Sequence, residues 1–189
     1  MAVSGRVAVI DANVLYSIEL TDLLLTFAAH RLVRVHWSPT ILDEVRRNLA
    51  KRADLVPDSI AYRIDRMNLA VPSALDEAPE ALVAAMPITE HDRHVLALAV
   101  HVEADSIVTF NLRDFPVVAC EPYGVEVVDP DSFAVAVVEI DPAGVQAALA
   151  DIARRRTRPA MTVHDILDRL AALVPTFASR VRATSPGTA

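Results

Sequence analysis

The sequence predicts an α/β protein with a mostly parallel central sheet covered by helices, followed by a helical C-terminal extension. Short runs of β-branched apolar residues alternate with longer segments of helical periodicity, which is the order typical of parallel sheets. After about residue 130 the strand pattern stops and Ala- and Arg-rich helical sequence begins. We therefore expect one domain over residues 1–130 and a helical extension over residues 131–189 that ends in a flexible tail.

The composition is that of a folded chain with a substantial core. Hydrophobic residues make up 53% of the 189 residues and charged residues 23%, which argues against disorder. The single cysteine, Cys120, excludes an internal disulfide and a cysteine-based zinc cage. No apolar run reaches the roughly 20 residues of a membrane span, and the first residues lack the layout of a signal peptide. We therefore expect a cytoplasmic protein that makes no membrane contact.

The net charge of −7 argues against broad, nonspecific binding of nucleic acid. Basic residues nevertheless gather in two places, residues 46–52 and residues 154–158. This distribution suits a protein that holds cations centrally and contacts phosphates at its rim, and it suits many other proteins as well.

Four apolar runs are predicted strands: residues 6–10, 32–37, 106–110 and 125–129. Right-handed crossovers between parallel strands place the loops that follow each strand along one edge of the sheet. Side chains that are far apart in the sequence can therefore meet at that edge, where α/β sheets bind ligands.

Helical periodicity and capping residues predict the intervening helices. Ser38 and Pro39 suit the cap and first position of one helix, and Thr162 with Asp165 forms a capping box in the extension. Prolines interrupt the helical pattern of residues 58–86, which predicts a longer helix followed by a shorter one in this segment. The expected helical segments before the extension are residues 14–29, 39–52, 58–86 with this interruption, and 89–103.

Four acidic residues follow predicted strands or lie near predicted helix starts at this edge: Asp11, Glu44, Asp92 and Asp114. Three of them have an ordinary explanation when taken singly. Asp92 could complete a capping box with Thr89, Glu44 could stabilise the dipole of its helix, and Asp114 could be a turn residue. Asp11 has fewer such explanations, because an apolar strand runs directly into its charge.

Taken together, the four carboxylates point to a divalent cation. Clustered carboxylates repel one another and destabilise a fold unless a cation neutralises them. Oxygen ligands favour Mg²⁺ or Mn²⁺ over zinc, and such ions activate water and neutralise charge on a phosphate. A zinc site built on His94 and His101 is disfavoured because no third ligand accompanies them.

Four motifs carry a resemblance to a known family. They are "VAVIDANVLYS" with Asp11, "SPTILDEVRRNL" with Glu44, "DRHVLALAV" with Asp92, and "IVTFNLRDFP" with Asn111 and Asp114. In this order and spacing they resemble the PIN-domain ribonucleases, and among those the VapC-type toxins of toxin–antitoxin pairs. The resemblance covers about residues 5–130, and the sequence after it is similar to the helical extension of one subgroup.

The resemblance implies a PIN-like three-layer sandwich and a metal-dependent endoribonuclease that leaves a 5′-phosphate. The catalytic and metal-binding residues would be the four carboxylates, with Mg²⁺ as the cofactor and Mn²⁺ as the alternative. Many relatives have aspartate where Asn111 stands, so one metal and two metals both remain open. Thr109 and Asn111 would support the site. Arg93 and Arg113 would contact substrate phosphates, unless they are plain surface charges.

The resemblance also implies partners. Besides the RNA substrate, we expect a cognate antitoxin that occupies an apolar groove formed by helices within residues 14–71 and inserts an arginine among the carboxylates. A homodimer is expected as well. The helices of the extension would pack back on the domain or cover part of that groove.

Two other functions compete with this one. An aspartyl-phosphate phosphatase or phospho-receiver also places an aspartate after a strand, but it needs a lysine near the phosphoryl group. Lys51, the only lysine, is poorly placed for this, and Asn13 stands where the phosphatase pattern has a second aspartate. A noncatalytic PIN-like module that binds RNA or protein is the other alternative, motivated by Asn111 and the acidic net charge.

Overall fold

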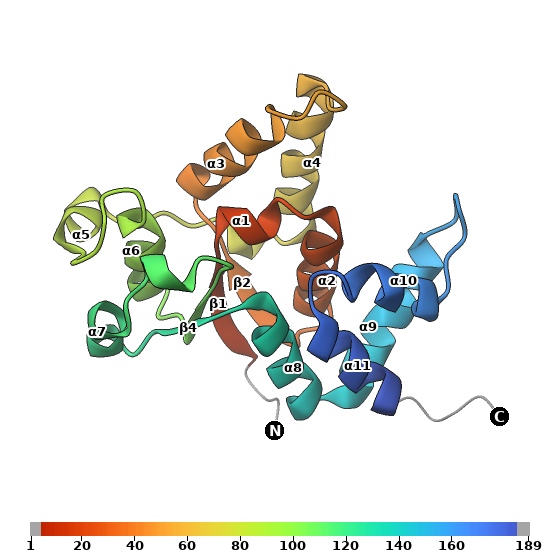
Figure 1. The fold of residues 1–189 in the computed structure, drawn as a ribbon. Helices are drawn as coiled ribbons and strands as arrows, with labels where there is room; N and C mark the ends of the chain where they lie inside the picture. Colours follow the sequence, from red (N-terminus) through yellow and green to blue (C-terminus); the bar gives the residue numbers. More distant parts are fainter. Residues whose placement is uncertain (1–4, 185–189) are drawn as a thin grey trace.

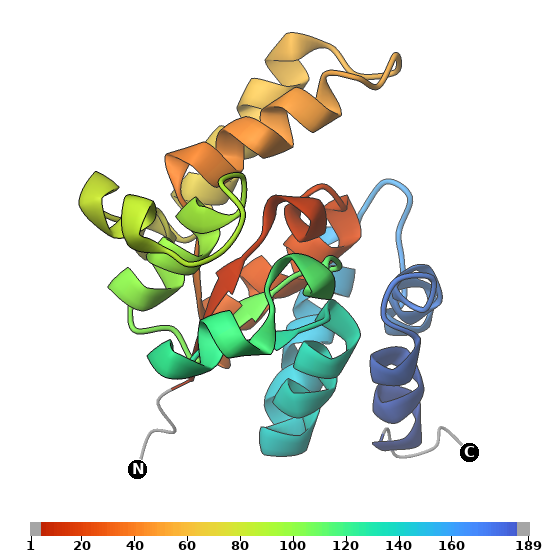
Figure 2. The ribbon, with the colours of Figure 1, turned by 60° about the vertical axis from the view of Figure 1, so that its left-hand side comes forward.

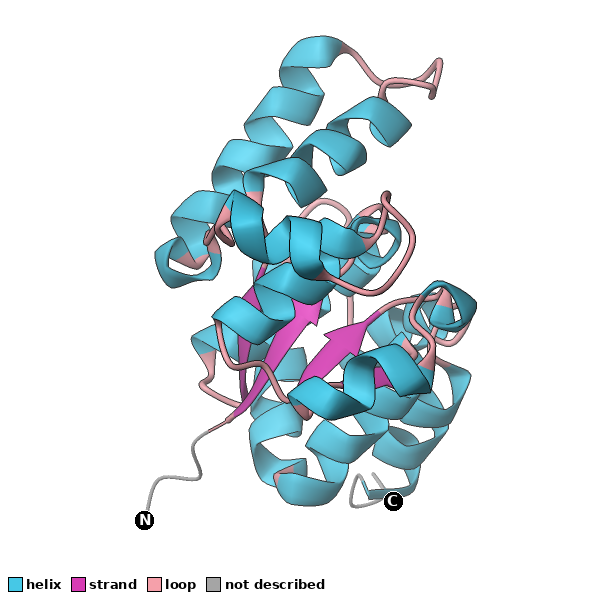
Figure 3. Cartoon of the chain, turned by 90° about the vertical axis from the view of Figure 1, so that its left-hand side faces the viewer, coloured by secondary structure: helices cyan, strands magenta, loops and turns pink. Residues whose placement is uncertain are grey.

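Four parallel strands form the centre of the molecule in the computed structural model, which describes residues 5–184. The strands β1 (Arg6–Ile10), β2 (Val33–His36), β3 (Ser106–Val108) and β4 (Glu126–Val128) pair in the order β2-β1-β3-β4. Helices enclose this sheet (Figure 3). The predicted α/β fold with a helix-covered parallel sheet is confirmed, and three of the strands are shorter than expected.

Helices account for most of the remaining chain. Those before the extension are α1 (Ala12–Leu15), α2 (Ile18–Ala29), α3 (Pro39–Leu49), α4 (Pro57–Ala70), α5 (Glu80–Ala85), α6 (Arg93–His101) and α7 (Val117–Cys120), with the short 3₁₀ helices η1 (Pro72–Ala74), η2 (Leu112–Asp114) and η3 (Glu121–Tyr123). The extension consists of α8 (Pro130–Ile140), α9 (Pro142–Arg155), α10 (Val163–Leu170) and α11 (Pro175–Thr184). Helices α3 and α4 project together from the body, and α8 to α11 gather on one side of it (Figures 1 and 2).

Capping residues explain where several helices begin. The hydroxyl of Ser38 accepts the N–H of Ile41 at the start of α3, and the capping box of Thr162 and Asp165 opens α10, as predicted. The single helix expected over residues 14–29 is wrong. The chain breaks into α1 and α2 because Ser17 caps a new helix, accepting the Leu20 N–H at 3.2 Å.

The helix expected over residues 89–103 begins later than predicted. Residues 89–92 form a turn in which the N–H of Asp92 donates to the carbonyl of Thr89 at 3.1 Å, and α6 starts at Arg93. Asp92 therefore precedes the first turn of α6 instead of lying within it. This places its carboxylate on the loop side of the helix start.

The extension shares the hydrophobic core of the sheet domain. Phe27 of α2 and Phe177 of α11 are both fully buried, and their rings meet edge to face with centroids 6.1 Å apart. An aromatic pair of this geometry adds about 0.5–1.5 kcal/mol to the burial of its area. The four C-terminal helices are thus attached to α2 by apolar packing. The division into two domains at residue 130 stays a prediction.

Ion pairs reinforce this attachment. Asp22 of α2 accepts from Arg155 at 3.1 Å and from Arg156 at 2.7 Å, and Arg155 also donates to the hydroxyl of Thr26 at 2.6 Å. The Asp22 side chain is only 19% exposed, so these contacts are shielded from solvent more than ordinary surface pairs. One carboxylate on α2 therefore holds two arginines from the end of the extension's second helix.

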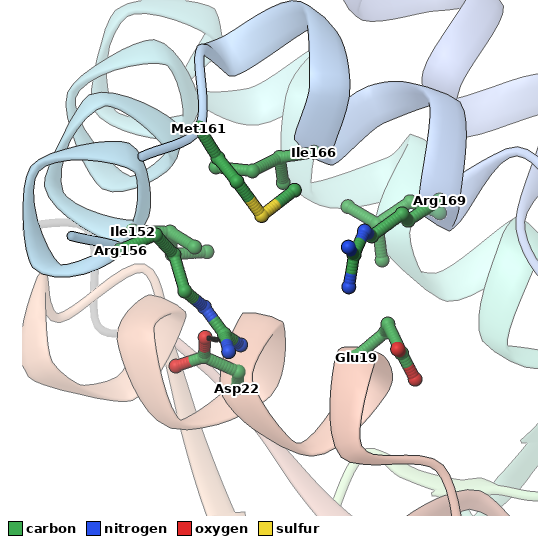
Figure 4. A pocket seen from close by; sticks show the side chains of 8 residues that line it. Glu19, Asp22, Ile152, Arg156, Met161, Ile166 and Arg169 are labelled. Atoms are coloured by element: carbon green, nitrogen blue, oxygen red, sulfur yellow. Dashed lines mark hydrogen bonds and ion pairs between the residues drawn. The ribbon is translucent and has the colours of Figure 1, made fainter. Parts of the chain in front are cut away.

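A small crevice lies beside these ion pairs (Figure 4). It has a volume of about 20 Å³, which suffices for about one water molecule. Met161 points into it, and Arg169 lies across from Glu19. The extension thus fits closely against the start of α2.

Along residues 5–184, no single helix is both long and apolar enough to cross a membrane. Helices α8 and α9 reach the required length and apolarity only as a pair, with a bend of 116° between them. The flexible tail predicted for the C-terminus lies in residues 185–189, outside the described part of the chain.

We expect Asp22→Ala to lower the free energy of unfolding by about 2 kcal/mol, because it removes the carboxylate that pairs with Arg156 and one of the two that pair with Arg155. Glu139→Ala is the matched control, since Glu139 pairs with Arg180 at a side-chain exposure of 57%. That surface pair should contribute about 0.5 kcal/mol or less. Denaturant-induced unfolding monitored by circular dichroism measures both losses, and equal losses would contradict the assigned role of Asp22.

Candidate active site

Asp11 lies at the carboxyl edge of the sheet, directly after β1. Its backbone N–H donates to the carbonyl of Val108 at 3.1 Å, which extends the pairing with β3 by one residue. Its side chain is buried, with 9% of the residue exposed. A charged group in such a place is costly unless hydrogen bonds or counter-charges stabilise it.

Three donors hold the Asp11 carboxylate. Oδ1 accepts the N–H of Ala12 at 2.6 Å, and Oδ2 accepts both the amide of Asn13 and the hydroxyl of Thr109, each at 2.6 Å. Thr109 follows β3 and is fully buried. Because β1 and β3 are neighbours in the sheet, the hydroxyl at the end of β3 lies within hydrogen-bond distance of Asp11. The orientation of the carboxylate is therefore set by two strands and one helix start.

Asn13 is a member of the site that the sequence analysis missed. Its amide nitrogen donates to Asp11 and, at 2.9 Å, to the hydroxyl of Thr109, while its carbonyl oxygen accepts the N–H of Phe110 at 3.1 Å. It thereby ties the start of α1 to the loop after β3. The signal in the sequence is the Asp-x-Asn spacing at a strand end.

Glu44 of α3 pairs with His94 of α6. Oε1 of Glu44 lies 3.2 Å from Nε2 of His94, and Arg47 approaches the same oxygen at 3.8 Å. Nδ1 of His94 is buried and has no hydrogen-bond partner within the described residues. His101 pairs instead with Asp76 at 3.5 Å, so the two histidines serve different carboxylates. A zinc site shared by them finds no support.

Asp92 accepts a hydrogen bond from the hydroxyl of Thr89, just before α6. Its charge and that of Glu44 both act on Asp11. Burial raises the pKa of Asp11 most strongly, and hydrogen bonds from Thr109 and Ala12 oppose this effect without cancelling it. The repulsion from Glu44 and Asp92 raises the Asp11 pKa further. The charges of Glu44 and Asp92 therefore act on the Asp11 carboxylate.

Asp114 is placed differently from those three. It ends the exposed 3₁₀ helix η2, where its N–H donates to the carbonyl of Asn111 at 3.0 Å, and the charges that raise the Asp11 pKa come from Glu44 and Asp92. Asn111 itself donates its N–H to the Thr109 hydroxyl at 3.0 Å, while its side chain is exposed. The loop after β3 is thus linked to Asp11 through its backbone.

The two arginines of the predicted site differ in their environment. Nε of Arg93 donates to the carbonyl of Ile88 at 3.1 Å, which holds this side chain against the preceding loop. Arg113 is exposed and has no ion pair or side-chain hydrogen bond to any residue within 5–184. Of the two, Arg113 therefore has the guanidinium that is free to meet a ligand.

The donor chemistry of the site fits a hard divalent cation. Asp11, Glu44 and Asp92 offer only oxygen atoms, and a cation would relieve the repulsion that raises the Asp11 pKa. Across the described residues, no three His, Cys, Asp or Glu side chains are grouped closely enough to form a metal cage. The fit to a divalent cation therefore rests on the oxygen donors and on the repulsion between Asp11 and the other two carboxylates. It does not rest on side chains already spaced to coordinate an ion.

The raised pKa of Asp11 predicts a pH dependence in metal-free protein. Its contribution to stability is complete below the pKa of the unfolded state and is lost as the pH rises through the higher folded-state pKa. In EDTA, we therefore expect the loss of Tm caused by Asp11→Ala to shrink as the pH rises from about 3 to about 7. Thermal melts of wild type and variant across this range measure it.

Asp129 provides a control of opposite sign. Burial alone would raise the pKa of Asp129, but hydrogen bonds from the hydroxyl and N–H of Ser132 and from the N–H of Asp131 outweigh it and lower this pKa. The loss of Tm caused by Asp129→Ala should therefore shrink as the pH falls. A trend of the same sign in both variants would contradict the electrostatic account of Asp11.

The contact with Glu44 predicts a role for His94 in metal binding. Removing a residue that hydrogen-bonds to a metal ligand and orients it typically weakens metal affinity about 10- to 100-fold. We expect His94→Ala to weaken Mn²⁺ binding by this factor in isothermal titration calorimetry. His94→Gln keeps an N–H donor and should retain most of the affinity. If both variants bind Mn²⁺ as tightly as wild type, His94 does not orient Glu44.

Both parts of this chain are similar to known protein families. Residues 130–183 match the VapC50 C-terminal domain family. One relative, "Putative ribonuclease VapC50" of Mycobacterium tuberculosis (strain ATCC 25618 / H37Rv), is 37% identical over 105 residues. These are 56% of this chain and 62% of the relative, so the match spans less than two thirds of the relative's length. No solved structure matches the chain significantly. Because the PIN domain family matches residues 7–113, more than half of the sequence, the chain belongs to the PIN domain family.

Proposed function

We propose that this chain is a metal-dependent endoribonuclease that cleaves RNA phosphodiester bonds. The observation that supports this most strongly is the buried Asp11, which is held by Asn13 and Thr109 and repelled by Glu44 and Asp92. A fold gains nothing from keeping three mutually repelling carboxylates at its ligand-binding edge unless a cation joins them. Membership in the PIN domain family makes RNA the substrate we propose.

The proposed metal ligands are Asp11, Glu44, Asp92 and Asp114, with Mg²⁺ as the ion and Mn²⁺ as the alternative. Such an ion activates water and neutralises the charge that builds on a phosphate during hydrolysis. The other residues of the site act on these ligands. Asn13, like Thr109, orients Asp11 by donating to Oδ2, and His94 orients Glu44.

Arg113 is the proposed contact to substrate phosphate. The arginine-rich segments identified in the sequence are partly neutralised by nearby carboxylates, as in the ion pairs Arg52–Asp54 and Arg156–Asp22. Arg113 has no such partner within the described chain and lies in the loop that follows Thr109. Arg93, whose Nε is held by the Ile88 carbonyl, has a smaller role in this proposal.

We also propose a protein partner for this chain, the antitoxin of a toxin–antitoxin pair. A groove of about 590 Å³ lies between α2 and α4, lined by apolar side chains such as Leu25, Ile60 and Met67. Its lining falls within residues 14–71, where we expected a partner groove, except for Arg155 and Arg156 at the end of α9. The extension therefore leaves the groove accessible and adds two basic residues to it.

The groove has a basic character that suits an acidic, amphipathic partner segment. Arg63 and Arg66 line it together with Arg155 and Arg156, and the carboxylate in the lining is Asp22. Burial lowers the pKa of Arg63, whose Nε has no hydrogen-bond partner among the described residues. Insertion of a partner's arginine among the carboxylates, a homodimer and a cytoplasmic location remain predictions.

The phosphatase alternative gains no support from these contacts. Lys51 follows the end of α3, is exposed, and donates to Asn48 at 3.0 Å. Both donors of the Asn13 amide are already used by Asp11 and Thr109. A phosphatase of this kind would need the ammonium group of a lysine beside the phosphoryl group and an aspartate in place of Asn13.

Asp11→Asn tests the proposal. With Mg²⁺, wild type should cleave an RNA pool and lose this activity in EDTA, and Asp11→Asn should reduce the rate by about 100-fold or more because an essential metal ligand is lost. Asp58→Asn changes an exposed aspartate of α4 and should leave the rate unaltered. Gel electrophoresis of end-labelled RNA measures all four reactions.

Equal cleavage by wild type and Asp11→Asn would reveal a contaminating nuclease. Thermal stabilisation of wild type by Mn²⁺ without any cleavage would favour the noncatalytic binding module instead. Neither cleavage nor a Mn²⁺-dependent shift of Tm would refute the proposal as a whole.

A further inference from the structure

Exposed apolar side chains are concentrated in the segment after β3. Five of the large hydrophobic residues exposed in the described chain lie within 14 residues: Phe110, Leu112, Val117, Val118 and Tyr123. Phe110 is 44% exposed, whereas the four other phenylalanines of the chain are exposed by 2% or less. Folding normally buries a phenylalanine because of its large apolar area. The exposure of Phe110 therefore calls for an explanation outside the core.

Phe110 is fixed beside the candidate active site by its backbone. Its N–H donates to the side-chain Oδ1 of Asn13 at 3.1 Å, and the side-chain Nδ2 of the same Asn13 donates to Asp11. Thr109, directly before Phe110, donates its hydroxyl to Asp11 at 2.6 Å. The exposed ring is thus attached to the residues that orient the proposed metal ligand, and not to a distant surface.

A cation without a protein partner accompanies the exposed ring. Arg113 follows Leu112, which is also 44% exposed, and forms no ion pair with any described residue. Exposed aromatic, aliphatic and guanidinium groups in one short loop can meet both parts of a nucleotide. The ring offers a face for a base, and the guanidinium offers donors for a phosphate.

We propose that Phe110, Leu112 and Arg113 form a nucleotide-binding platform at the rim of the active site. A base of the RNA next to the cleaved phosphate stacks on Phe110 with support from Leu112, and Arg113 binds a neighbouring phosphate. This inference rests on the proposed ribonuclease function and adds the residues that hold the base and the phosphate next to the cleaved bond. The faces of bases within a duplex are covered by their neighbours, so an aromatic side chain can stack only on bases that are splayed out.

The favoured occupant is RNA and not a second protein. Val117 and Val118, at 72% and 81% exposure, would by themselves suit a protein interface. Phe110 and Arg113 are the members of this segment closest in sequence to Thr109 and Asp114, and their combination matches base and phosphate. Self-association through Val117 and Val118 would instead appear as a change in oligomeric state.

Phe110→Ala and Phe110→Trp test the platform on an unpaired RNA oligonucleotide and on the same sequence in a duplex. We expect Phe110→Ala to raise KM for the unpaired RNA about 5- to 150-fold, which corresponds to the loss of one stacked base, with little change in kcat. Phe110→Trp should stay within about twofold of wild type because indole also stacks. Val118→Ala, outside the platform, should leave KM unchanged, and wild type should prefer the unpaired RNA.

Fluorescence anisotropy of the labelled RNA in EDTA gives a second readout that needs no cleavage. Phe110→Ala should weaken binding by a similar factor, with an unchanged Tm showing that the fold is intact. If wild type cleaves RNA while Phe110→Ala keeps its KM and affinity, the platform is wrong and the ribonuclease proposal stands. If Phe110→Ala instead changes the oligomeric state in light scattering, the segment is a protein interface and the inference is overturned. Weakened binding in the absence of any cleavage would support the platform and refute the nuclease.

Discussion

The burial of one carboxylate constrains the organisation of this protein's functional edge. The Asp11 carboxyl lies in a nearly closed environment, where three donors offset part of the cost of burying its charge. Each hydrogen bond to a charged group contributes about 1.5–3 kcal/mol, which offsets part of the cost of burial. The donors come from the start of α1 and from Thr109 after β3. The arrangement therefore requires β1 and β3 to be neighbours in the sheet.

That requirement connects the topology to the chemistry. The order β2-β1-β3-β4 puts β1 next to β3, and parallel pairing brings the ends of both strands to the same edge. Glu44, within α3, and Asp92, just before α6, carry charges that raise the Asp11 pKa. The same hydrogen bonds that hold Asp11 also fix the backbone of Phe110. The site and its exposed rim are thus parts of one connected network.

The C-terminal extension belongs to a different part of the molecule. It packs on α2 through Phe177 and through the arginines that pair with Asp22. By covering one side of α2 and supplying Arg155 to the groove beside α4, it changes the surface that a protein partner would meet. The extension therefore bears on partner binding more directly than on the chemistry at Asp11.

The fold class, the four strands and most helix positions follow from the sequence alone, because apolar periodicity and capping residues are local signals. The acidic residues of the functional edge stay a prediction. The side-chain contacts depend on the tertiary structure: Asn13 joins Asp11 to Thr109, and His94 pairs with Glu44. These contacts join residues that are up to about a hundred positions apart, so they depend on strand order and helix packing, which local periodicity does not encode.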